Sequence, residues 1–306
     1  MPTLKQLRYL VAIADTLHFR RAAELSHISQ PTLSGQLREL EERLGVQLVE
    51  RSRAKVVLTP IGKEIAGRAR TILRDVTDLI DLAKQGQDVL GGMLRLGVLS
   101  SLGPYLLPHI LPELHQTYPQ LKLYVREGMP NALLHGLDEG SLDVLIFPLP
   151  VKGADLRIAR LFREPLLIAA ARDHALANKE FAERSDLKGE TVLALERGHR
   201  LHDQVRELCD LYGAKLALDY EGTSLDTLRQ MVGMGMGFTF LPALYVRSEI
   251  PKDGEVAARP MRARPPSRTI GMIWRRHSAR GDEFAALAGL TRGIIKGRVP
   301  EVTVIS

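Results

Sequence analysis

The chain has 306 residues, of which 45% are hydrophobic, so it can form one to three globular domains. Its formal net charge of +6 permits nucleic-acid binding without proving it, because residues 1–91 carry 14 basic and 11 acidic residues and hold only part of the excess. No apolar run approaches a membrane span, no secretory signal is recognisable, and the one cysteine, Cys209, excludes a disulfide within the chain and a cysteine-rich zinc site. We therefore expect a cytoplasmic protein with no membrane partner.

Residues 1–58 are predicted to form a DNA-binding domain. A helix over residues 4–14 precedes a short helix over residues 19–25. The following residues, Ser-His-Ile-Ser, end this second helix. Ser29 is a good N-cap, and Pro31 suits the first turn of the next helix. That helix carries leucines at helical spacing, namely Leu33, Leu37, Leu40 and Leu44. Two short helices joined by a turn are typical of a helix-turn-helix.

The outer face and first turn of the second helix carry side chains suited to base edges. Glutamine can pair with adenine through two hydrogen bonds, and serine or threonine can contact any base. The candidates are Gln30, Pro31, Thr32, Ser34, Gln36 and Arg38. The alternative is a helical hairpin that merely packs.

The residues that follow favour DNA binding. Gly45 ends the helix, and residues 48–58 are predicted to form two short strands around a basic tip. Arg51 and Arg53, with Lys55, would face phosphates, where affinity is electrostatic and independent of base sequence. This pattern predicts a winged helix-turn-helix.

Residues 59–90 are predicted to form a linker helix that begins after the cap Thr59 and Pro60. Its apolar residues alternate steps of four and three, at Ile65, Ala69, Ile72, Val76, Leu79 and Ala83. A core face is the ordinary explanation of this spacing, but the other faces are strongly polar, so we favour a dimerisation seam. Two winged heads per dimer would bind two half-sites of an operator.

Residues 91–306 are predicted to form an α/β regulatory domain. Strands are expected over residues 93–98, 121–125, 142–147, 166–171, 191–195, 216–220, 238–241 and 268–274, and helices over 105–114, 132–137, 201–212, 223–232 and 282–295. This alternation predicts a parallel, doubly wound sheet, with ligands at the carboxyl ends of its strands. Its length favours two subdomains with a cleft, over about 91–163 with 267–306 and about 164–266.

Polar residues at strand ends and helix starts are candidates for binding an effector. Helix N-termini favour anions, and hydroxyl and guanidinium groups suit a carboxylate. The candidates are Ser100, Ser101, His199, Arg200, Thr223 and Ser224. The alternative for each serine or threonine is a simple helix cap.

Enzyme motifs are absent from the sequence. It contains no phosphate loop, no strand-borne dinucleotide fingerprint, no nucleophile elbow and no metal-binding histidine spacing, so we expect neither an enzyme nor a cofactor or metal. Cys209 could be paired with His199 or His202 as a thiol nucleophile, but it lies beside Leu208 within an amphipathic helix. A buried structural thiol is the better interpretation.

The segment LRYLVAIADTLHFRRAAELSHISQPTLSGQLRELEERLGVQLVERS resembles the LysR-type transcriptional regulators, and the resemblance covers essentially the whole chain. It implies a winged helix-turn-helix, a linker helix and a periplasmic-binding-protein-like effector domain. It also implies a homodimer or homotetramer on double-stranded promoter DNA, with RNA polymerase as a partner and activation as the favoured outcome. On the family pattern Gln30, Pro31, Thr32 and Ser34 approach bases, and Arg51 and Arg53 approach the backbone or minor groove.

Within that family the chain resembles the OxyR subfamily of peroxide sensors, through the segments GPYLLPHILPELHQTYPQL, TSLDTLRQMV and LPAL. The subfamily senses peroxide with two cysteines, of which the reactive one follows a Gly-His pair. Here Arg200 follows Gly198 and His199, whereas Cys209 matches the second cysteine. Three other pocket positions also depart from the subfamily pattern, namely Ser101, Pro130 and Asp219.

A guanidinium cannot replace a thiolate nucleophile, because it is never deprotonated in proteins. Three hypotheses follow. The chain is an OxyR-like regulator of oxidative-stress or related genes that has lost disulfide sensing, with Arg200 holding one conformation or binding a small anionic metabolite. Alternatively, Cys209 senses oxidant alone, as a sulfenic acid or an inter-subunit disulfide. The third hypothesis is a small-molecule binding protein or enzyme without DNA function, which the winged helix-turn-helix disfavours.

Overall fold

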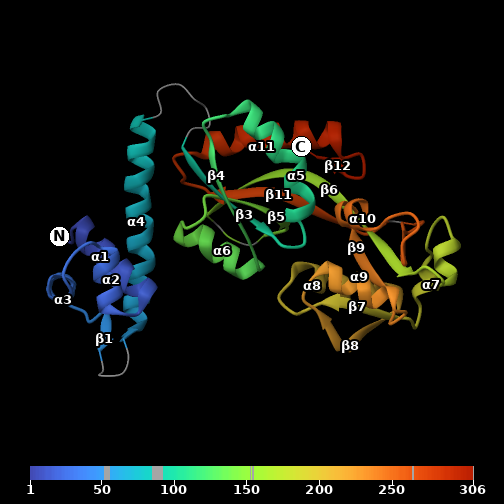
Figure 1. The fold of residues 1–306 in the computed structure, drawn as a ribbon, viewed down its shortest axis with the longest axis horizontal. Coiled ribbons are helices and arrows are strands. Elements are labelled where there is room, and N and C mark those ends of the chain that lie inside the picture. Colours follow the sequence, from blue (N-terminus) through green and yellow to red (C-terminus); the bar gives the residue numbers. More distant parts are fainter. Residues whose placement is uncertain (52–55, 85–91, 152, 154, 264, 306) are drawn as a thin grey trace. The chain divides into compact units, whose positions relative to one another are not determined.

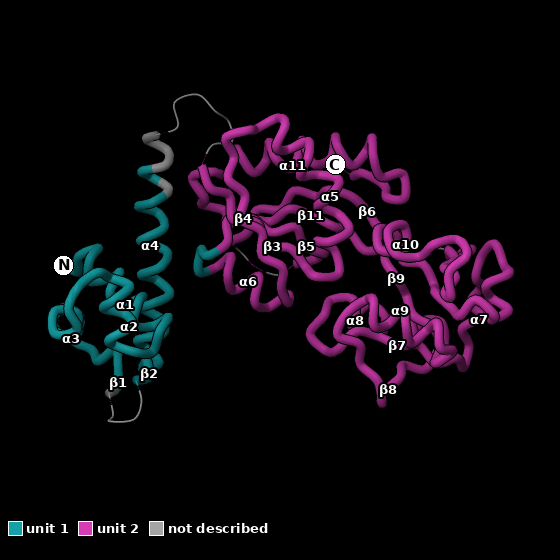
Figure 2. The backbone as a smooth tube through the Cα atoms, viewed as in Figure 1, with its two compact units in different colours: residues 1–88, 139–141 teal, residues 89–138, 142–306 magenta. Residues whose placement is uncertain are grey.

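The chain divides into two compact units in a computed structural model that describes residues 1–51, 56–84, 92–151, 153, 155–263 and 265–305. Unit 1 comprises residues 1–88 and 139–141, and unit 2 comprises residues 89–138 and 142–306 (Figure 2). Each unit has buried hydrophobic cores of its own. None of the helices in the described part of the chain has the length and apolar character needed to cross a membrane.

Unit 1 is a winged helix-turn-helix followed by a long helix (Figure 1). Its elements are α1 (Leu4–Thr16), α2 (Phe19–Leu25), α3 (Gln30–Leu44), β1 (Val49–Arg51), β2 (Val56–Leu58) and α4 (Pro60–Lys84). Strands β1 and β2 pair antiparallel, with Val49 opposite Leu58. The predicted helices and the two wing strands are confirmed, whereas Arg53 and Lys55 at the predicted tip lie outside the described residues.

Local capping interactions explain where these elements begin and end. The Ser29 hydroxyl accepts a hydrogen bond from the Thr32 amide at 3.3 Å, which fixes the start of α3. Gly45 ends α3 in the left-handed region at φ +69°, where a residue with a Cβ would be strained. The Thr59 hydroxyl accepts from the Gly62 amide at 2.9 Å and donates to the Gln47 carbonyl at 2.8 Å, so it joins the start of α4 to the wing.

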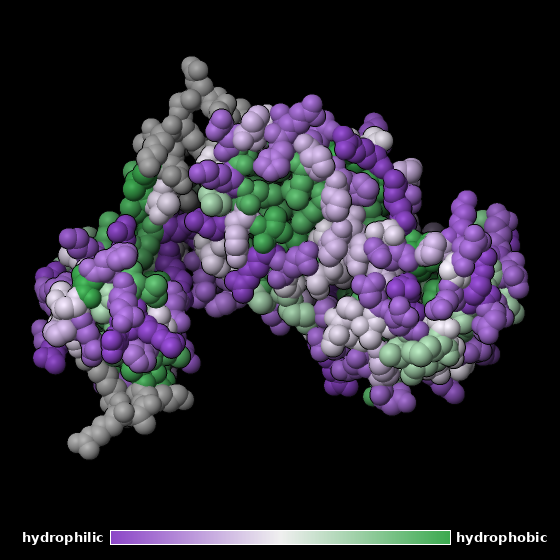
Figure 3. Space-filling model, in the orientation of Figure 1, coloured by the Kyte–Doolittle hydropathy of each residue, from purple (hydrophilic) through white to green (hydrophobic). Residues whose placement is uncertain are grey.

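The predicted seam of α4 has a buried and an exposed part. The seam residue Ala69 and the nearby Ala66 are buried, in the part of α4 that packs against α1. Further along, Ile72, Leu79 and Ile80 are exposed, and Figure 3 shows hydrophobic residues along this helix. The first turns of α4 therefore belong to the core of unit 1, and the later turns present an apolar face. The side chain of Ala83 lies outside the described residues.

Unit 2 is an α/β structure with a mixed sheet. Its strands are β3 (Met93–Leu99), β4 (Lys122–Gly128), β5 (Val144–Leu149), β6 (Leu156–Ala171), β7 (Thr191–Leu195), β8 (Lys215–Gly222), β9 (Thr239–Pro242), β10 (Val256–Arg259), β11 (Ser267–Arg275) and β12 (Thr303–Val304). Its helices are α5 (Gly103–Thr117), α6 (Pro130–Glu139), the 3-10 helix η1 (Ala175–Asn178), α7 (Arg184–Leu187), α8 (Arg200–Tyr212), α9 (Leu225–Gly233), α10 (Ala243–Glu249) and α11 (Gly281–Arg298).

The prediction of an entirely parallel sheet is wrong. Strand order is β10-β6-β11-β5-β3-β4, with β9 and β12 also paired to β6. Strands β3, β4 and β5 are mutually parallel, but β11 pairs antiparallel with both β5 and β6. The chain returns along β11 after the segment that carries β7 to β10, and this return places an antiparallel strand in the centre of the sheet. Strands β7 and β8 form a separate parallel pair.

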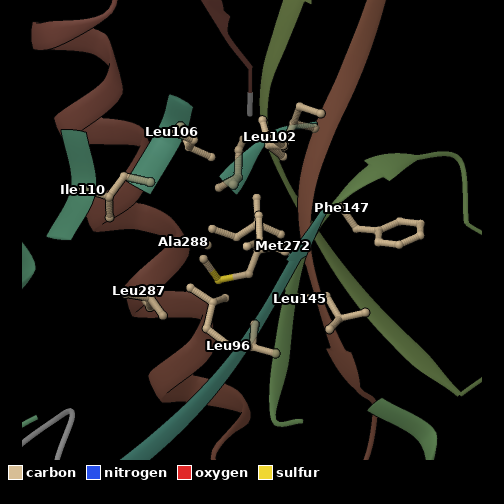
Figure 4. Packing of buried hydrophobic residues seen from close by; sticks show 14 of the residues in the cluster. Leu96, Leu102, Leu106, Ile110, Leu145, Phe147, Met272, Leu287 and Ala288 are labelled. Atoms are coloured by element: carbon tan, nitrogen blue, oxygen red, sulfur yellow. The ribbon is translucent and has the colours of Figure 1, made fainter. Parts of the chain in front are cut away.

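Strand β6 connects two hydrophobic cores. Its first half pairs with β11 and contributes Leu161 and Phe162 to one core, which is packed between the sheet, α5 and α11 (Figure 4). Its second half pairs with β9 and β10 and contributes Leu166 and Ile168 to the other core. A single strand therefore runs through both halves of unit 2, and groups near its middle can link them.

Candidate DNA interface and effector site

Helix α3 separates a buried leucine face from an exposed polar face. Leu33, Leu37 and Leu40 are at most 1% exposed. The predicted contact residues lie on the same helix: Gln30, Pro31, Thr32 and Arg38 are exposed, and Ser34 and Gln36 are half-buried. The core of unit 1 therefore holds the helix by its leucine face and leaves the first turn exposed.

The polar side chains on α3 differ in how they are held. The Thr32 hydroxyl lies 2.8 Å from the Ser29 hydroxyl, within the helix cap. The Gln36 amide donates to Glu39 at 3.1 Å. Arg38 has no hydrogen-bond or ion-pair partner among the described residues, so its guanidinium is available to a ligand.

The wing is positioned by a carboxylate that sequence analysis missed. Glu41 Oε1 accepts hydrogen bonds from the amides of Leu48 and Val49, at 2.8 and 3.1 Å. This pair of bonds ties β1 to α3. The backbone of Arg51 lies in β1, while its side chain and the whole of Arg53 are outside the described part, so their predicted phosphate contacts stay a prediction.

Ser101 takes part in a buried polar network near the middle of β6. Arg268 donates to the Ser101 hydroxyl at 3.2 Å and to the Ser101 carbonyl at 2.9 Å. The Nε atom of Arg268 lies 2.7 Å from Glu164 Oε2, and Glu164 Oε1 accepts from the Leu244 amide at 3.0 Å. Glu164 is fully buried and Arg268 is 4% exposed, so each charge is compensated by the other. Sequence analysis missed both residues of this ion pair.

The other hydroxyl candidates lie on separate elements. Ser224 caps α9, since its hydroxyl accepts from the Thr227 amide at 3.2 Å, and this confirms the capping interpretation for Ser224. Thr223 and Ser100 are both exposed. No hydrogen bond between described residues joins Ser101, Thr223 and Arg200 into one site.

Arg200 and His199 lie at the start of α8. Arg200 is the first residue of the helix, and its Nη2 atom donates to the Pro150 carbonyl at 2.5 Å, in the segment that follows β5. His199 is 6% exposed, and burial lowers the pKa of its imidazole, although Glu196 at 3.7 Å acts in the opposite direction. The lowered pKa favours a neutral His199, so Arg200 is the cation at this helix start.

Cys209 lies in the second core of unit 2. It is 3% exposed, and burial, with a smaller contribution from Asp210, raises the pKa of its thiol to about 11. The prediction of a buried structural thiol is confirmed. Within the ranges that the structure describes, no group of acidic, histidine or cysteine side chains could hold a metal ion.

Two family models together match most of the chain. Residues 4–63 match the bacterial regulatory helix-turn-helix protein of the lysR family, and residues 87–293 match the LysR substrate binding domain. The chain is 44% identical over 299 residues to the DNA-binding transcriptional dual regulator OxyR of Escherichia coli K12, covering 98% of each chain. It is 34% identical to the HTH-type transcriptional regulator EstR of Acinetobacter baylyi, covering 96% of this chain and 97% of that one.

The chain is also similar to solved structures of OxyR proteins. A full-length OxyR variant from Pseudomonas aeruginosa superposes with a TM-score of 0.79 at 37% identity, covering 95% of this chain and 94% of that one. The oxidized form of Corynebacterium glutamicum OxyR superposes with a TM-score of 0.60 at 33% identity, covering 97% of this chain and 94% of that one.

Proposed function

The chain belongs to the LysR family of bacterial transcriptional regulators, and we propose that α3 reads promoter DNA in the major groove while the wing contacts the backbone. The observation that carries this proposal is the uncharged polar first turn of α3, exposed on the side opposite the leucine core. The amide of Gln30 can pair with adenine through two hydrogen bonds, and the guanidinium of Arg38, which has no partner among the described residues, can bind guanine or phosphate.

Substitution of Gln30 tests the base-reading role. Gln30→Ala should weaken binding to the chain's own promoter about tenfold, because a bidentate base contact is worth about 1–3 kcal/mol, and it should leave binding to scrambled DNA unchanged. Arg53→Ala is the matched comparison. Loss of a phosphate contact should weaken binding to promoter DNA and to scrambled DNA equally, and it should reduce the slope of log affinity against log salt concentration by about 1. The measurement is a gel-shift titration at several salt concentrations. Equal losses on promoter and scrambled DNA for Gln30→Ala would contradict the assigned role.

The regulatory response is proposed to differ from a disulfide switch. Several relatives are named hydrogen peroxide-inducible genes activators, which supports a role for this chain in oxidative-stress or related genes. The chain contains one cysteine, and Arg200 stands at the start of α8, where it donates to the Pro150 carbonyl. We infer that intramolecular disulfide sensing is lost and that Arg200 holds this helix start in one arrangement.

Footprinting on the chain's own upstream promoter tests this inference. Purified protein would be bound first under dithiothreitol and then after treatment with hydrogen peroxide. Identical footprints are expected, because the buried thiol of Cys209 has a raised pKa and no partner cysteine exists in the chain. A footprint that shortens or shifts with peroxide would overturn the inference and favour sensing by Cys209 through a sulfenic acid or an inter-subunit disulfide.

Self-association and a polymerase contact complete the proposal. The exposed apolar part of α4 supports a homodimer, with a homotetramer as the larger assembly that family membership favours. On the basis of the same membership we also propose activation of transcription, RNA polymerase as a partner at the promoter, and action in the cytoplasm. The effector is proposed to be a small anionic metabolite.

A further inference from the structure

A cavity of about 550 Å³ opens on one face of the sheet of unit 2. Strands β5, β6 and β11 form it, together with the segment after β12. The lining residues on which the argument depends are Leu149, Ile158, Arg160, Arg163, Thr269 and Ile305. Its volume lies within the range of small-molecule sites in proteins.

The strand register places two arginines on this one face. Arg160 lies opposite Gly271 and Arg163 lies opposite Thr269 across the β6–β11 pair. Residues three apart in a regular strand point to opposite faces. Here the register shifts between Ile270 and Gly271, so β6 contains one extra residue between the two arginines and both share a face. The bulge is therefore what brings two cations into one cavity.

No described residue neutralises either guanidinium. Arg160 and Arg163 make no side-chain hydrogen bond or ion pair with any residue that the structure describes, and the described lining contains no carboxylate. Arg292 adds a further cation nearby, since its Nη1 atom donates to the Arg160 carbonyl at 2.8 Å. Two like charges on one face repel each other, and an anion placed between them would relieve that repulsion.

The remaining lining determines the kind of anion. Leu149, Ile158 and Ile305 give apolar walls, and Thr269 supplies a hydroxyl on the strand opposite Arg163. Gly271 lets the Leu149 side chain pack closely against β11, because a Cβ there would lie 2.8 Å from Leu149 Cδ1. We propose that this cavity binds a small organic anion, with a carboxylate or sulfonate held by Arg160 and Arg163 and an apolar body against the aliphatic walls.

This inference rests on the proposed function and extends it, because a hydrogen bond joins the wall of the cavity to the start of α8. Pro150 is part of the cavity wall, and its carbonyl accepts the hydrogen bond from Arg200. A ligand that moves the Leu149–Val151 wall would act directly on the start of α8. The position of this effector site would thus explain how an anion can be sensed without a thiol.

Titration of the full-length protein with anilinonaphthalene sulfonate, a fluorescent aromatic sulfonate, tests the site. Arg160→Gln/Arg163→Gln should bind the probe at least about tenfold more weakly than wild type, since hydrogen bonds to charged groups are the stronger kind. Arg157→Gln is the matched control, because Arg157 is an exposed arginine of the same strand that does not line the cavity. Neutral anilinonaphthalene should bind wild type and the double variant equally. Phenylbutyrate should displace the sulfonate from wild type at concentrations at which inorganic phosphate does not.

The proposal is overturned if the double variant binds the sulfonate as wild type does, if Arg157→Gln weakens binding equally, or if phosphate competes as well as phenylbutyrate. Circular dichroism melting of each variant shows whether it is folded, and glutamine keeps most of the aliphatic stem of arginine. Gel shifts without any ligand separate this proposal from the DNA-binding function. The double variant should retain promoter affinity, whereas loss of DNA binding by wild type itself would contradict only the proposed function.

Discussion

The surroundings of Cys209 keep its thiol neutral. The side chain belongs to a hydrophobic core, and burial raises its pKa to about 11. At neutral pH roughly one molecule in ten thousand would carry the reactive thiolate, compared with a few per cent for an ordinary cysteine. We expect the native protein to react with a disulfide reagent such as dithionitrobenzoate at least a hundredfold more slowly than the unfolded chain. Rapid reaction of the native thiol would contradict this.

The same raised pKa predicts how stability depends on pH. The unfolded thiol ionises near its ordinary value, whereas the folded thiol stays protonated until about pH 11, so the unfolded state loses its proton first. The contribution of this thiol to the free energy of unfolding is therefore fully present below about pH 8.5 and is lost as the pH rises toward 11. The melting temperature of wild type should fall more between pH 8 and 10, roughly, than that of Cys209→Ala. Burial also raises the pKa of Tyr105, but this group affects the melting temperatures of wild type and Cys209→Ala alike, so its effect cancels in the comparison.

The ion pair of Glu164 and Arg268 is predicted to be costly to break. Glu164→Ala would leave the Arg268 guanidinium buried without its carboxylate, a change that typically costs about 3–5 kcal/mol. Glu301→Ala is the control, because Glu301 and Arg247 form a pair whose side chains are 35% and 37% exposed, and such pairs are worth about 1 kcal/mol or less. Urea unfolding of unit 2 measures both. Equal losses for the two variants would show that burial does not determine the cost.

At the scale of elements, helices with local caps were predictable and strands set by distant pairing were not. Helices α2 and α3 begin and end at signals within a few residues, such as the Ser29 cap and Gly45. By contrast, β6 runs from Leu156, yet only its apolar second half was predicted, because charged residues interrupt the first half. That first half is a strand because β11, more than 100 residues later, pairs with it. The short strands β10 and β12 likewise exist only through pairing with β6.

The candidate site shows the same limit. Ser101 and Ser224 look alike in the sequence, each a hydroxyl after a strand and before a helix. Ser224 proves to be a helix cap, a role that depends on Thr227 three residues away. Ser101 instead accepts from Arg268, which is 167 positions away, and no local pattern reveals such a contact. The two arginines of the cavity also escaped prediction, because only the bulge in β6 places them together.

Helix α8 sets a geometric condition on any attempt to restore a disulfide. Positions 200 and 209 both lie in this helix, nine residues apart, which corresponds to about 13 Å along its axis. A disulfide requires Cα atoms within about 7 Å, so α8 must unwind before Arg200→Cys can bond to Cys209. We expect Arg200→Cys to lose both free thiols after peroxide treatment, with a simultaneous loss of helical signal. Arg206→Cys is a comparison that needs no unwinding, because residues three apart on a helix lie about 5–6 Å from each other, so loss of its two thiols should leave the helical signal unchanged. Persistence of both thiols in Arg200→Cys would show that α8 cannot rearrange in this chain.

At the scale of the whole molecule, the chain carries a DNA-reading unit and a regulatory unit, each with its own core. The early turns of helix α4 pack into the core of the first unit, whereas its later turns are exposed. The periodicity of its apolar residues was readable from the sequence. Which of them the unit itself buries was not, because that depends on packing against α1. The exposed remainder is the part of α4 that self-association would cover.

Charges placed on this exposed seam should therefore prevent dimerisation without unfolding unit 1. Ile72→Asp/Leu79→Asp changes two residues that are 45% and 66% exposed and seven positions apart, so both lie on one face of the helix. We expect the variant to sediment as a monomer, because two carboxylates would have to be desolvated in the dimer seam. In a dimer, binding of the first head raises the effective concentration of the second head at its half-site. A monomer lacks this gain, so the affinity of the variant for a promoter with two half-sites should fall toward its affinity for a single half-site. Thr77→Asp, an exposed change on the same helix outside the seam, should remain a dimer. If the double variant also stays dimeric and binds as wild type does, the subunits must associate through surfaces other than α4.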